Sequence, residues 1–132
     1  MVAGMNIDRV QFLTVPVSDQ AKARDFYVGK LGFDLFVDVS GPHGQFVMVG
    51  PKRAETGLVL VDRAVGGLDL DTRVHFQLST ADVDADIAEL RAQGVDVEDA
   101  EEMPWGRVTS VKDPDGNVMG LLQPSGYGNW PR

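Results

Sequence analysis

Apolar side chains recur at intervals of three and four residues in two stretches of the chain. They are Ala23, Phe26, Tyr27 and Leu31 in the first stretch and Val83, Ile87 and Leu90 in the second. This spacing predicts two helices, each with one apolar side that packs on a sheet. Residues that favour helix ends flank both stretches, namely Ser18 or Asp19 with Gly32, and Thr80 or Asp82 with Gly94.

Runs of strand-forming residues lie on both sides of each predicted helix, and turns rich in proline and glycine separate most of them. One run starts at Phe12 and another at His75, ahead of the helices. The later runs are Phe33 to Val39, Gln45 to Val49 and Gly57 to Val61 in the first half, and Val95 to Val97, Arg107 to Val111 and Asn117 to Leu122 in the second. The order of strand, helix and three strands, found twice, predicts an α+β fold.

The two halves correspond to each other as an internal duplication. In each half a short strand leads to an aspartate and a helix, and the helix ends at a Gly-apolar-Asp-apolar segment. The aspartates are Asp19 and Asp82, and the segments begin at Gly32 and Gly94. We expect one domain. The expected boundaries are residues 1–132 for the domain, 8–62 and 72–123 for its modules, and 124–132 for a C-terminal tail.

Three motifs add a more specific signal to the duplication. They are PVSD at the end of the first strand, DFYVGKLGF in the first helix and DPDGN in the last turn. In this order the chain resembles the vicinal oxygen chelate superfamily of glyoxalases, bleomycin-resistance proteins and extradiol dioxygenases, over Val10 to Gln123. The resemblance implies two tandem βαβββ modules whose curved mixed sheets surround a cleft. It also implies that a second subunit commonly completes the cleft and that the first and last strands of each module carry metal ligands.

Most of the positions at which the resemblance places metal ligands lack a metal-binding side chain. These positions are Phe12, His75, Gly120 and the strand Gly57 to Val61. Only His75 can coordinate a metal, and the nearest carboxylates of the strand are Glu55 and Asp62 at its margins. Since such metal sites need roughly three protein ligands, we expect no metal ligands and no cofactor. A divalent metal is expected only if Glu55 or Asp62 forms an atypical site with His75.

Side chains alternate between the two faces of a strand, so parity predicts which residues share the face of the ligand positions. They are Phe12 and Thr14 in the first strand, His75, Gln77 and Ser79 in the fifth, and Val118, Gly120 and Leu122 in the last. Neighbouring strands and turns add the apolar residues Phe36, Phe46, Met48, Trp105 and Met119. A mostly apolar pocket with a few polar groups is typical of a small-molecule site, although each apolar residue taken singly also fits a core position.

Three residues near this face allow more than one interpretation. His75 is a structural histidine that hydrogen-bonds in the cleft, a general base that acts without metal, or one ligand of an incomplete site. Trp105 stacks on a planar ligand or is buried by a partner subunit. Arg107 neutralises an anionic group of a ligand or forms an exposed salt bridge with Glu101 or Glu102.

Composition narrows the function further. The chain has no cysteine, which excludes disulfides, thiolate metal sites and cysteine nucleophiles. A formal net charge of −8 disfavours nucleic acid and anionic membrane surfaces as partners. The acidic residues gather between Asp82 and Glu102, as a solvated helix face and loop or as a field that concentrates cationic ligands. Because the sequence has no long apolar stretch and no secretory signal, we expect a cytoplasmic protein. We expect His43, in a turn rich in glycine and proline, to lie in a surface loop.

Three functions fit these features, and the first is favoured. It is a metal-independent protein of the bleomycin-resistance type that sequesters an aromatic or cationic antibiotic or metabolite in the cleft of a homodimer. The second is a glyoxalase-like lyase, isomerase or dioxygenase with His75 as its catalytic base or in an atypical metal site. The third is a sensing or structural dimer. The predicted ligand-binding residues are Phe12, Thr14, Phe46, Met48, His75, Gln77, Trp105, Arg107 and Gly120.

Overall fold

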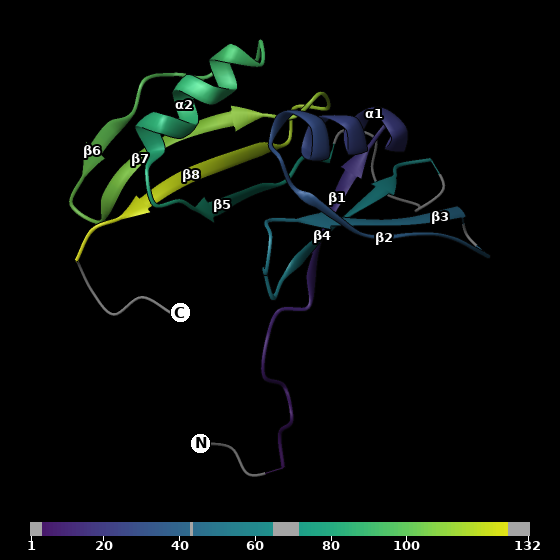
Figure 1. Ribbon diagram of the computed structural model, residues 1–132. Coiled ribbons are helices and arrows are strands. Elements are labelled where there is room, and N and C mark those ends of the chain that lie inside the picture. The colour runs from purple at the N-terminus through teal and green to yellow at the C-terminus, as the bar shows by residue number, and fades with distance from the viewer. Residues whose placement is uncertain (1–3, 43, 65–71, 127–132) are drawn as a thin grey trace.

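The computed structural model describes residues 4–42, 44–64 and 72–126, in which eight strands form two four-stranded sheets (Figure 1). Sheet A consists of β1 (Phe12–Val17), β2 (Asp34–Gly41), β3 (Gly44–Gly50) and β4 (Gly57–Asp62). Sheet B consists of β5 (His75–Ser79), β6 (Glu101–Met103), β7 (Gly106–Lys112) and β8 (Val118–Pro124). The α+β class and the tandem mixed sheets predicted from the sequence are confirmed.

The two sheets repeat one topology. Their strand orders are β1-β4-β3-β2 and β5-β8-β7-β6. The first strand of each module runs parallel to the last, and the other neighbours are antiparallel. The parallel pairs set Thr14 beside Val59 in sheet A and Gln77 beside Gly120 in sheet B. The internal duplication therefore extends to the pairing of the strands.

Helices cover one face of each sheet (Figure 1). In the first module α1 (Gln20–Arg24) continues into a π-helix, η1 (Asp25–Lys30), and in the second α2 (Val83–Ala92) is a regular helix. Asp19 and Asp82 are the N-caps, each accepting a backbone N–H bond of 3.0 Å. Gly32 and Gly94 follow the helices with φ values of +74° and +79°, which strongly favour glycine. None of these helices is long and apolar enough to cross a membrane.

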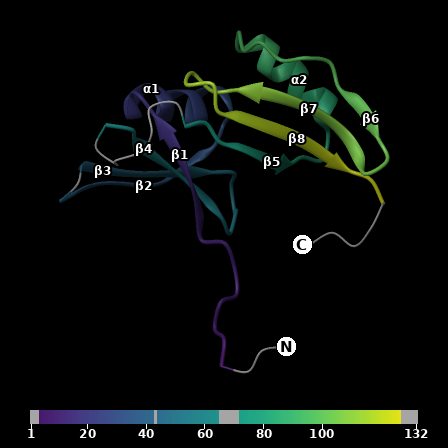
Figure 2. The ribbon, with the colours of Figure 1, turned by 180° about the vertical axis from the view of Figure 1, so that it is seen from behind.

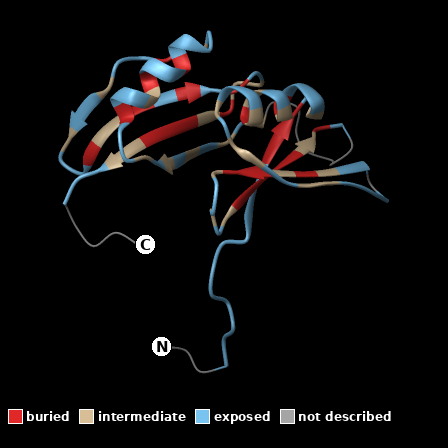
Figure 3. Ribbon diagram, viewed as in Figure 1, coloured by how far each residue is buried: buried red, intermediate tan, exposed pale blue. Residues whose placement is uncertain are grey.

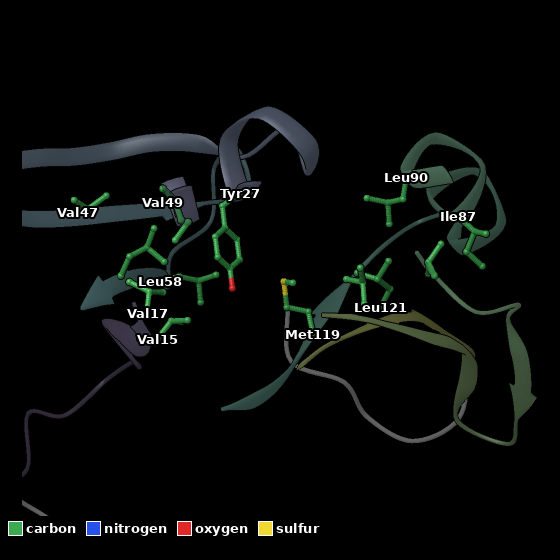
Figure 4. Close-up of a cluster of buried hydrophobic side chains, with 14 of the residues drawn as sticks. Val15, Val17, Tyr27, Val47, Val49, Leu58, Ile87, Leu90, Met119 and Leu121 are labelled. Carbon is green, nitrogen blue, oxygen red and sulfur yellow. The ribbon is translucent and has the colours of Figure 1, made fainter. Parts of the chain in front are cut away.

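A single apolar core fills the space between the helices and both sheets (Figures 3 and 4). Val15, Val17 and Leu60 of sheet A belong to the same cluster as Met119 and Leu121 of sheet B. Side chains of opposite parity on these strands face away from the helices. We call this second side of each sheet its open face.

A buried polar network joins the two modules beneath the helices. The Tyr27 hydroxyl donates to Oδ2 of Asp113 at 2.9 Å, and Nδ2 of Asn117 donates to the same oxygen at 2.8 Å and to the carbonyl of Pro16 at 2.9 Å. Burial, followed by the charge of Asp113, raises the pKa of Tyr27 far above its usual value. Because Tyr27 and Pro16 belong to the first module and Asp113 and Asn117 to the second, the network fixes one module against the other.

The prediction of a strand at Val95 to Val97 was wrong. Within the described residues this segment makes a single β-bridge, from Val97 to Val111, and the edge strand of sheet B is β6. Arg91 of α2 donates to the carbonyl of Val97 at 2.8 Å, so a helix side chain and a single bridge to β7 hold this segment in place of a continuous strand ladder. His43, residues 65–71 of the connection between the modules, and residues 127–132 of the expected tail lie outside the described residues.

Candidate functional site

The open face of sheet B contains a hollow of about 470 Å³. Its floor comes from three neighbouring strands, because the register aligns Gln77 of β5 with Gly120 of β8, and Gly120 with Ser110 of β7. The remaining lining residues are His75, Glu98, Asp99, Glu101, Trp105, Val108 and Thr109. The hollow thus contains four of the predicted site residues, namely His75, Gln77, Trp105 and Gly120.

The side chain of Gln77 lies directly above Gly120. A Cβ atom on residue 120 would overlap the amide group of Gln77, so glycine is needed for the observed position of this amide. Nε2 of Gln77 also lies 3.4 Å from Nε2 of His75. Gly120 and His75 therefore set where the amide lies, and the floor of the hollow presents an amide and an imidazole side by side.

Trp105 stands at the edge of the hollow on the tight turn between β6 and β7. Gly106 has a φ of +155°, and a side chain there would overlap the backbone of Gln123, so only glycine fits the turn. Ser125 also holds this turn through two hydrogen bonds. Its backbone N–H donates to the carbonyl of Trp105 at 3.1 Å, and its hydroxyl donates to the carbonyl of Pro104 at 3.0 Å. The indole remains 45% exposed on this fixed turn, and is available for stacking.

Three acidic residues line the hollow beside Trp105. Glu98, Asp99 and Glu101 lie in the segment that crosses from α2 to β6. Asp99 forms an ion pair of 2.9 Å with Arg91, whereas no described basic residue forms an ion pair with Glu98 or Glu101. The sequence indicates only that these residues belong to an acidic cluster and that Glu101 could pair with Arg107, because their placement in the hollow depends on the path of this segment across the sheet. The density of acidic residues between Asp82 and Glu102 was the one sequence feature that pointed to this part of the site.

The other predicted residues of the first module share the open face of sheet A. Phe12 and Phe46 meet edge to face with ring centroids 6.2 Å apart. Met48 is paired with Val59 and points to the same side, close to Gly57. Phe12 and Thr14 share this face, as strand parity predicted, and Phe46 and Met48 of β3 lie on it as well, but none of the four lines the hollow on sheet B. Their face is apolar and partly exposed, with Phe12 40% exposed.

Arg107 lies on the opposite side of sheet B, away from the hollow. Its guanidinium donates two hydrogen bonds to Asp84 of α2, at 2.8 and 2.9 Å, and one to Glu102 at 3.3 Å. Of the two sequence interpretations, this geometry matches the salt bridge with Glu102. The hydrogen bonds from Arg107 lower the pKa of the Asp84 carboxyl.

The residues present do not fit the metal of the resembled superfamily. Phe12 has no donor atom, Gly120 has no side chain, and the place above Gly120 is taken by the Gln77 amide. Asp62 accepts a backbone hydrogen bond from Ala64 at 2.9 Å, and belongs to sheet A, whereas His75 belongs to sheet B. The described residues contain no cluster of three or more histidine, aspartate or glutamate side chains placed to hold a metal ion.

Comparisons with known proteins agree with this architecture. Residues 7–121 match the family model of the Glyoxalase/Bleomycin resistance protein/Dioxygenase superfamily. The Bacillus subtilis (strain 168) protein YetH is 33% identical over 121 residues, which are 89% of this chain and 99% of YetH.

Two solved structures from Streptomyces sp. CB03234 are more similar in sequence. TnmS3, an antibiotic binding protein, is 50% identical with a TM-score of 0.84, and the match covers 92% of this chain and 99% of TnmS3. A glyoxalase/bleomycin resistance protein is 47% identical with a TM-score of 0.76, and the match covers 87% of this chain and all of the other.

Proposed function

Because this chain belongs to the glyoxalase/bleomycin resistance protein/dioxygenase superfamily, we propose that it is a metal-independent protein that sequesters an aromatic or cationic small molecule. The molecule is an antibiotic or a metabolite, and it occupies the hollow on sheet B. The similarity to TnmS3, an antibiotic binding protein, supports an antibiotic as the ligand. The observation that carries the proposal is the Gln77 amide above Gly120, which occupies the place where the superfamily would have a metal ligand, in a hollow of about 470 Å³.

The chemistry of the lining supports a planar ligand that carries a positive charge. The indole of Trp105 offers a flat apolar surface at the rim. Glu98 and Glu101 add negative charge to the same hollow, and a cation near an indole face gains a cation–π contribution as well. The Gln77 amide and the His75 imidazole at the floor supply hydrogen-bonding groups that orient the ligand.

A homodimer completes the proposed site. None of the described segments covers either open face, and the apolar residues Phe12, Phe46 and Met48 form a face suited to burial against protein. In this proposal the open face of sheet A of one protomer covers the hollow of its partner, so that these three residues and Thr14 become the second wall of the ligand site. We place the protein in the cytoplasm.

The proposal is tested with proflavine, a planar cationic acridine, against anthraquinone-2-sulfonate, a planar anion of similar size. We expect isothermal titration of the chelator-treated protein to show binding of the cation and much weaker binding of the anion. Quenching of tryptophan fluorescence supplies a second readout. The chain also contains Trp130, which lies outside the described residues, so the Trp105→Phe variant shows how much of the quenching comes from Trp105. Failure of both compounds to bind, or a preference for the anion, contradicts the proposed ligand chemistry.

An enzymatic function is the alternative, and one observation favours it. His75 lies in the hollow with an exposed side chain, where an imidazole is able to exchange a proton with a bound molecule. A lyase or isomerase of this kind would depend on His75 as its base. Conversion of a bound compound by the wild-type protein, abolished in His75→Ala without loss of binding, would establish this alternative over sequestration.

A further inference from the structure

The segment between α2 and β6 contains one residue more than the strand beside it. The chain leaves α2 and returns to β6 at the outer edge of sheet B (Figures 1 and 2). Val97 is paired with Val111 of β7, and Glu101 with Val108. From residue 97 to residue 101 the segment therefore advances four positions, whereas β7 advances only three, from residue 111 to residue 108. The extra residue makes residues 98–100 a β-bulge against β7.

The bulge changes the side of sheet B to which the acidic side chains point. In a regular strand Glu98 and Glu101, three residues apart, would face opposite sides, because successive side chains alternate. Both nevertheless line the hollow on the open face. One inserted residue shifts the alternation by one position, so the bulge explains why the two glutamates meet in the same hollow.

Two hydrogen-bonding side chains fix the bulge. The hydroxyl of Thr109, a residue that is only 8% exposed, donates to the carbonyl of Glu98 at 2.7 Å. Arg91 donates to the carbonyl of Val97 at 2.8 Å and to Oδ1 of Asp99 at 2.9 Å, and it belongs to α2, which covers the other face of the sheet. The two side chains thus supply hydrogen bonds to backbone carbonyls of a segment that has no continuous strand ladder.

We propose that Thr109 and Arg91 are positioning residues of the ligand site, which hold the bulge in the form that brings Glu98 and Glu101 into the hollow. Preorganised charges bind a cation better than charges that must first be ordered. The preference for a cation therefore depends on residues that act through the bulge and not on the ligand. This inference rests on the proposed function, and it names the residues that set its charge preference.

The first test compares Thr109→Val, which removes the hydroxyl at nearly constant volume, with Thr109→Ser, which retains it. Isothermal titration measures the affinity for proflavine and for acridone, a neutral planar compound of similar size. We expect Thr109→Val to weaken proflavine binding about three- to fivefold, the scale of a partly exposed ion pair, and acridone binding little. Thr109→Ser should keep the wild-type preference. Equal losses for both compounds, or the same loss in the serine variant, would assign Thr109 to packing alone and overturn its positioning role.

For Arg91 the two possible explanations predict opposite signs. Loss of its positive charge alone would make the hollow more negative and strengthen proflavine binding, whereas release of the bulge would weaken it. Arg107→Gln is the matched control, because it removes the same charge but Arg107 bonds Asp84 and Glu102 outside the bulge. We expect weaker proflavine binding in Arg91→Gln and not in Arg107→Gln. Unchanged or tighter binding in Arg91→Gln would overturn the role of Arg91.

A measurement without any ligand separates this inference from the proposed function. In a Trp130→Phe background Trp105 is the only tryptophan, and it lines the hollow with both glutamates. Carboxylates beside the indole favour collisional quenching by caesium over quenching by iodide. We expect Glu98→Gln and Thr109→Val each to lower the ratio of the two quenching constants, and Thr109→Ser to leave it unchanged.

A ratio that Thr109→Val leaves unchanged would overturn the positioning role, whether or not proflavine binds. A lowered ratio in a protein that does not bind proflavine would support the positioning role and contradict the proposed function alone. Circular dichroism checks that each variant is folded. If Thr109→Val does not fold, the ratio in Arg91→Gln decides, because the positioning role predicts a lower value there and loss of the positive charge alone predicts a higher one.

Discussion

The open faces of the two sheets differ much more than the sheets themselves. Sheets A and B share their strand order and pairing directions, and both pack their other face on helices in one core. The open face of sheet A carries aromatic and thioether side chains, whereas that of sheet B carries an imidazole, an amide and carboxylates around a hollow. The duplicated modules therefore share their topology and differ most on the faces that no core packing constrains.

The largest effect is expected at the rim of the hollow. Trp105→Ala removes the indole surface and should weaken proflavine binding about 30-fold, or about 2 kcal/mol, the range of an aromatic hot spot. Trp105→Phe retains an aromatic ring and should lose only part of this affinity. Because the indole is 45% exposed, the melting temperature should not change. Undiminished binding to the alanine variant in isothermal titration would place the ligand outside the hollow.

A buried polar network connects the two modules on the side of the sheets opposite their open faces. Tyr27→Phe removes the 2.9 Å bond to Asp113 and should lower the free energy of unfolding by about 2 kcal/mol, as for a hydrogen bond to a charged group. Asp113 keeps the 2.8 Å bond from Asn117, so the variant should still fold. Urea denaturation measures the loss. A change below the error of this measurement would show that the bond between Tyr27 and Asp113 does not stabilise the packing of the two modules.

Replacing an aromatic residue on sheet A should affect association more than the stability of one chain. Phe46→Ala removes an apolar ring from the open face that the proposed dimer buries, next to the partly exposed Phe12. We expect a roughly five- to tenfold rise in the dimer dissociation constant, measured by sedimentation velocity. Ser40→Ala, at an exposed position on neighbouring β2, is the control. A dimer equally tight in both variants would exclude this face from the interface.

A side chain on Gly120 should disturb the floor of the hollow without destabilising the fold. Gly120→Ala forces the Gln77 amide to move, which a flexible side chain does at little cost. We expect a loss of about 1 kcal/mol in ligand affinity, comparable to one hydrogen bond, with an unchanged urea midpoint. Gly29→Ala, whose Cβ would meet no atom within 4 Å, is the control away from the hollow. Equal ligand affinities of the two variants would show that Gln77 does not contribute to ligand binding.

The smallest effect is expected from Arg107, which lies behind the hollow. Arg107→Ala should leave proflavine affinity unchanged, because the guanidinium bonds Asp84 and Glu102 on the other side of sheet B. Its hydrogen bonds lower the pKa of the Asp84 carboxyl in the folded protein. The ion pair therefore stabilises the wild type fully at pH values above the pKa of an aspartate in the unfolded chain, about 3.9. This stabilisation is lost as the pH falls through the lower pKa of the folded protein. Thermal melts should show a small advantage of wild type at pH 7 that disappears in strong acid. A clear loss of proflavine affinity in Arg107→Ala would show that Arg107 takes part in ligand binding.

Local patterns predicted much of the fold and one half of the candidate site. Strand parity placed His75, Gln77 and Gly120 on one face because alternation follows from backbone geometry alone. The same rule placed Phe12 and Thr14 together on sheet A. Parity does not say how the two faces are related, and within one chain the structure leaves them on separate sheets.

The failures concern contacts that the alternation of apolar and polar residues within a single strand or helix does not reveal. The supposed strand at Val95 to Val97 is held by Arg91, and no alternation of three residues reveals such a side-chain contact. Glu98 and Glu101 line the hollow because of the path from α2 to β6, which local propensity does not encode. Arg107 illustrates the same limit, since its partner Asp84 lies on a helix that covers the opposite face.

The most direct test of the central claim, that the hollow binds its ligand without a metal, combines metal analysis with titration. Protein purified without chelator is assayed for zinc, nickel, iron and manganese, and proflavine binding is measured before and after EDTA treatment. We predict substoichiometric metal and the same dissociation constant in both titrations. One metal ion per chain, together with a loss of binding in EDTA that added metal restores, would contradict the claim.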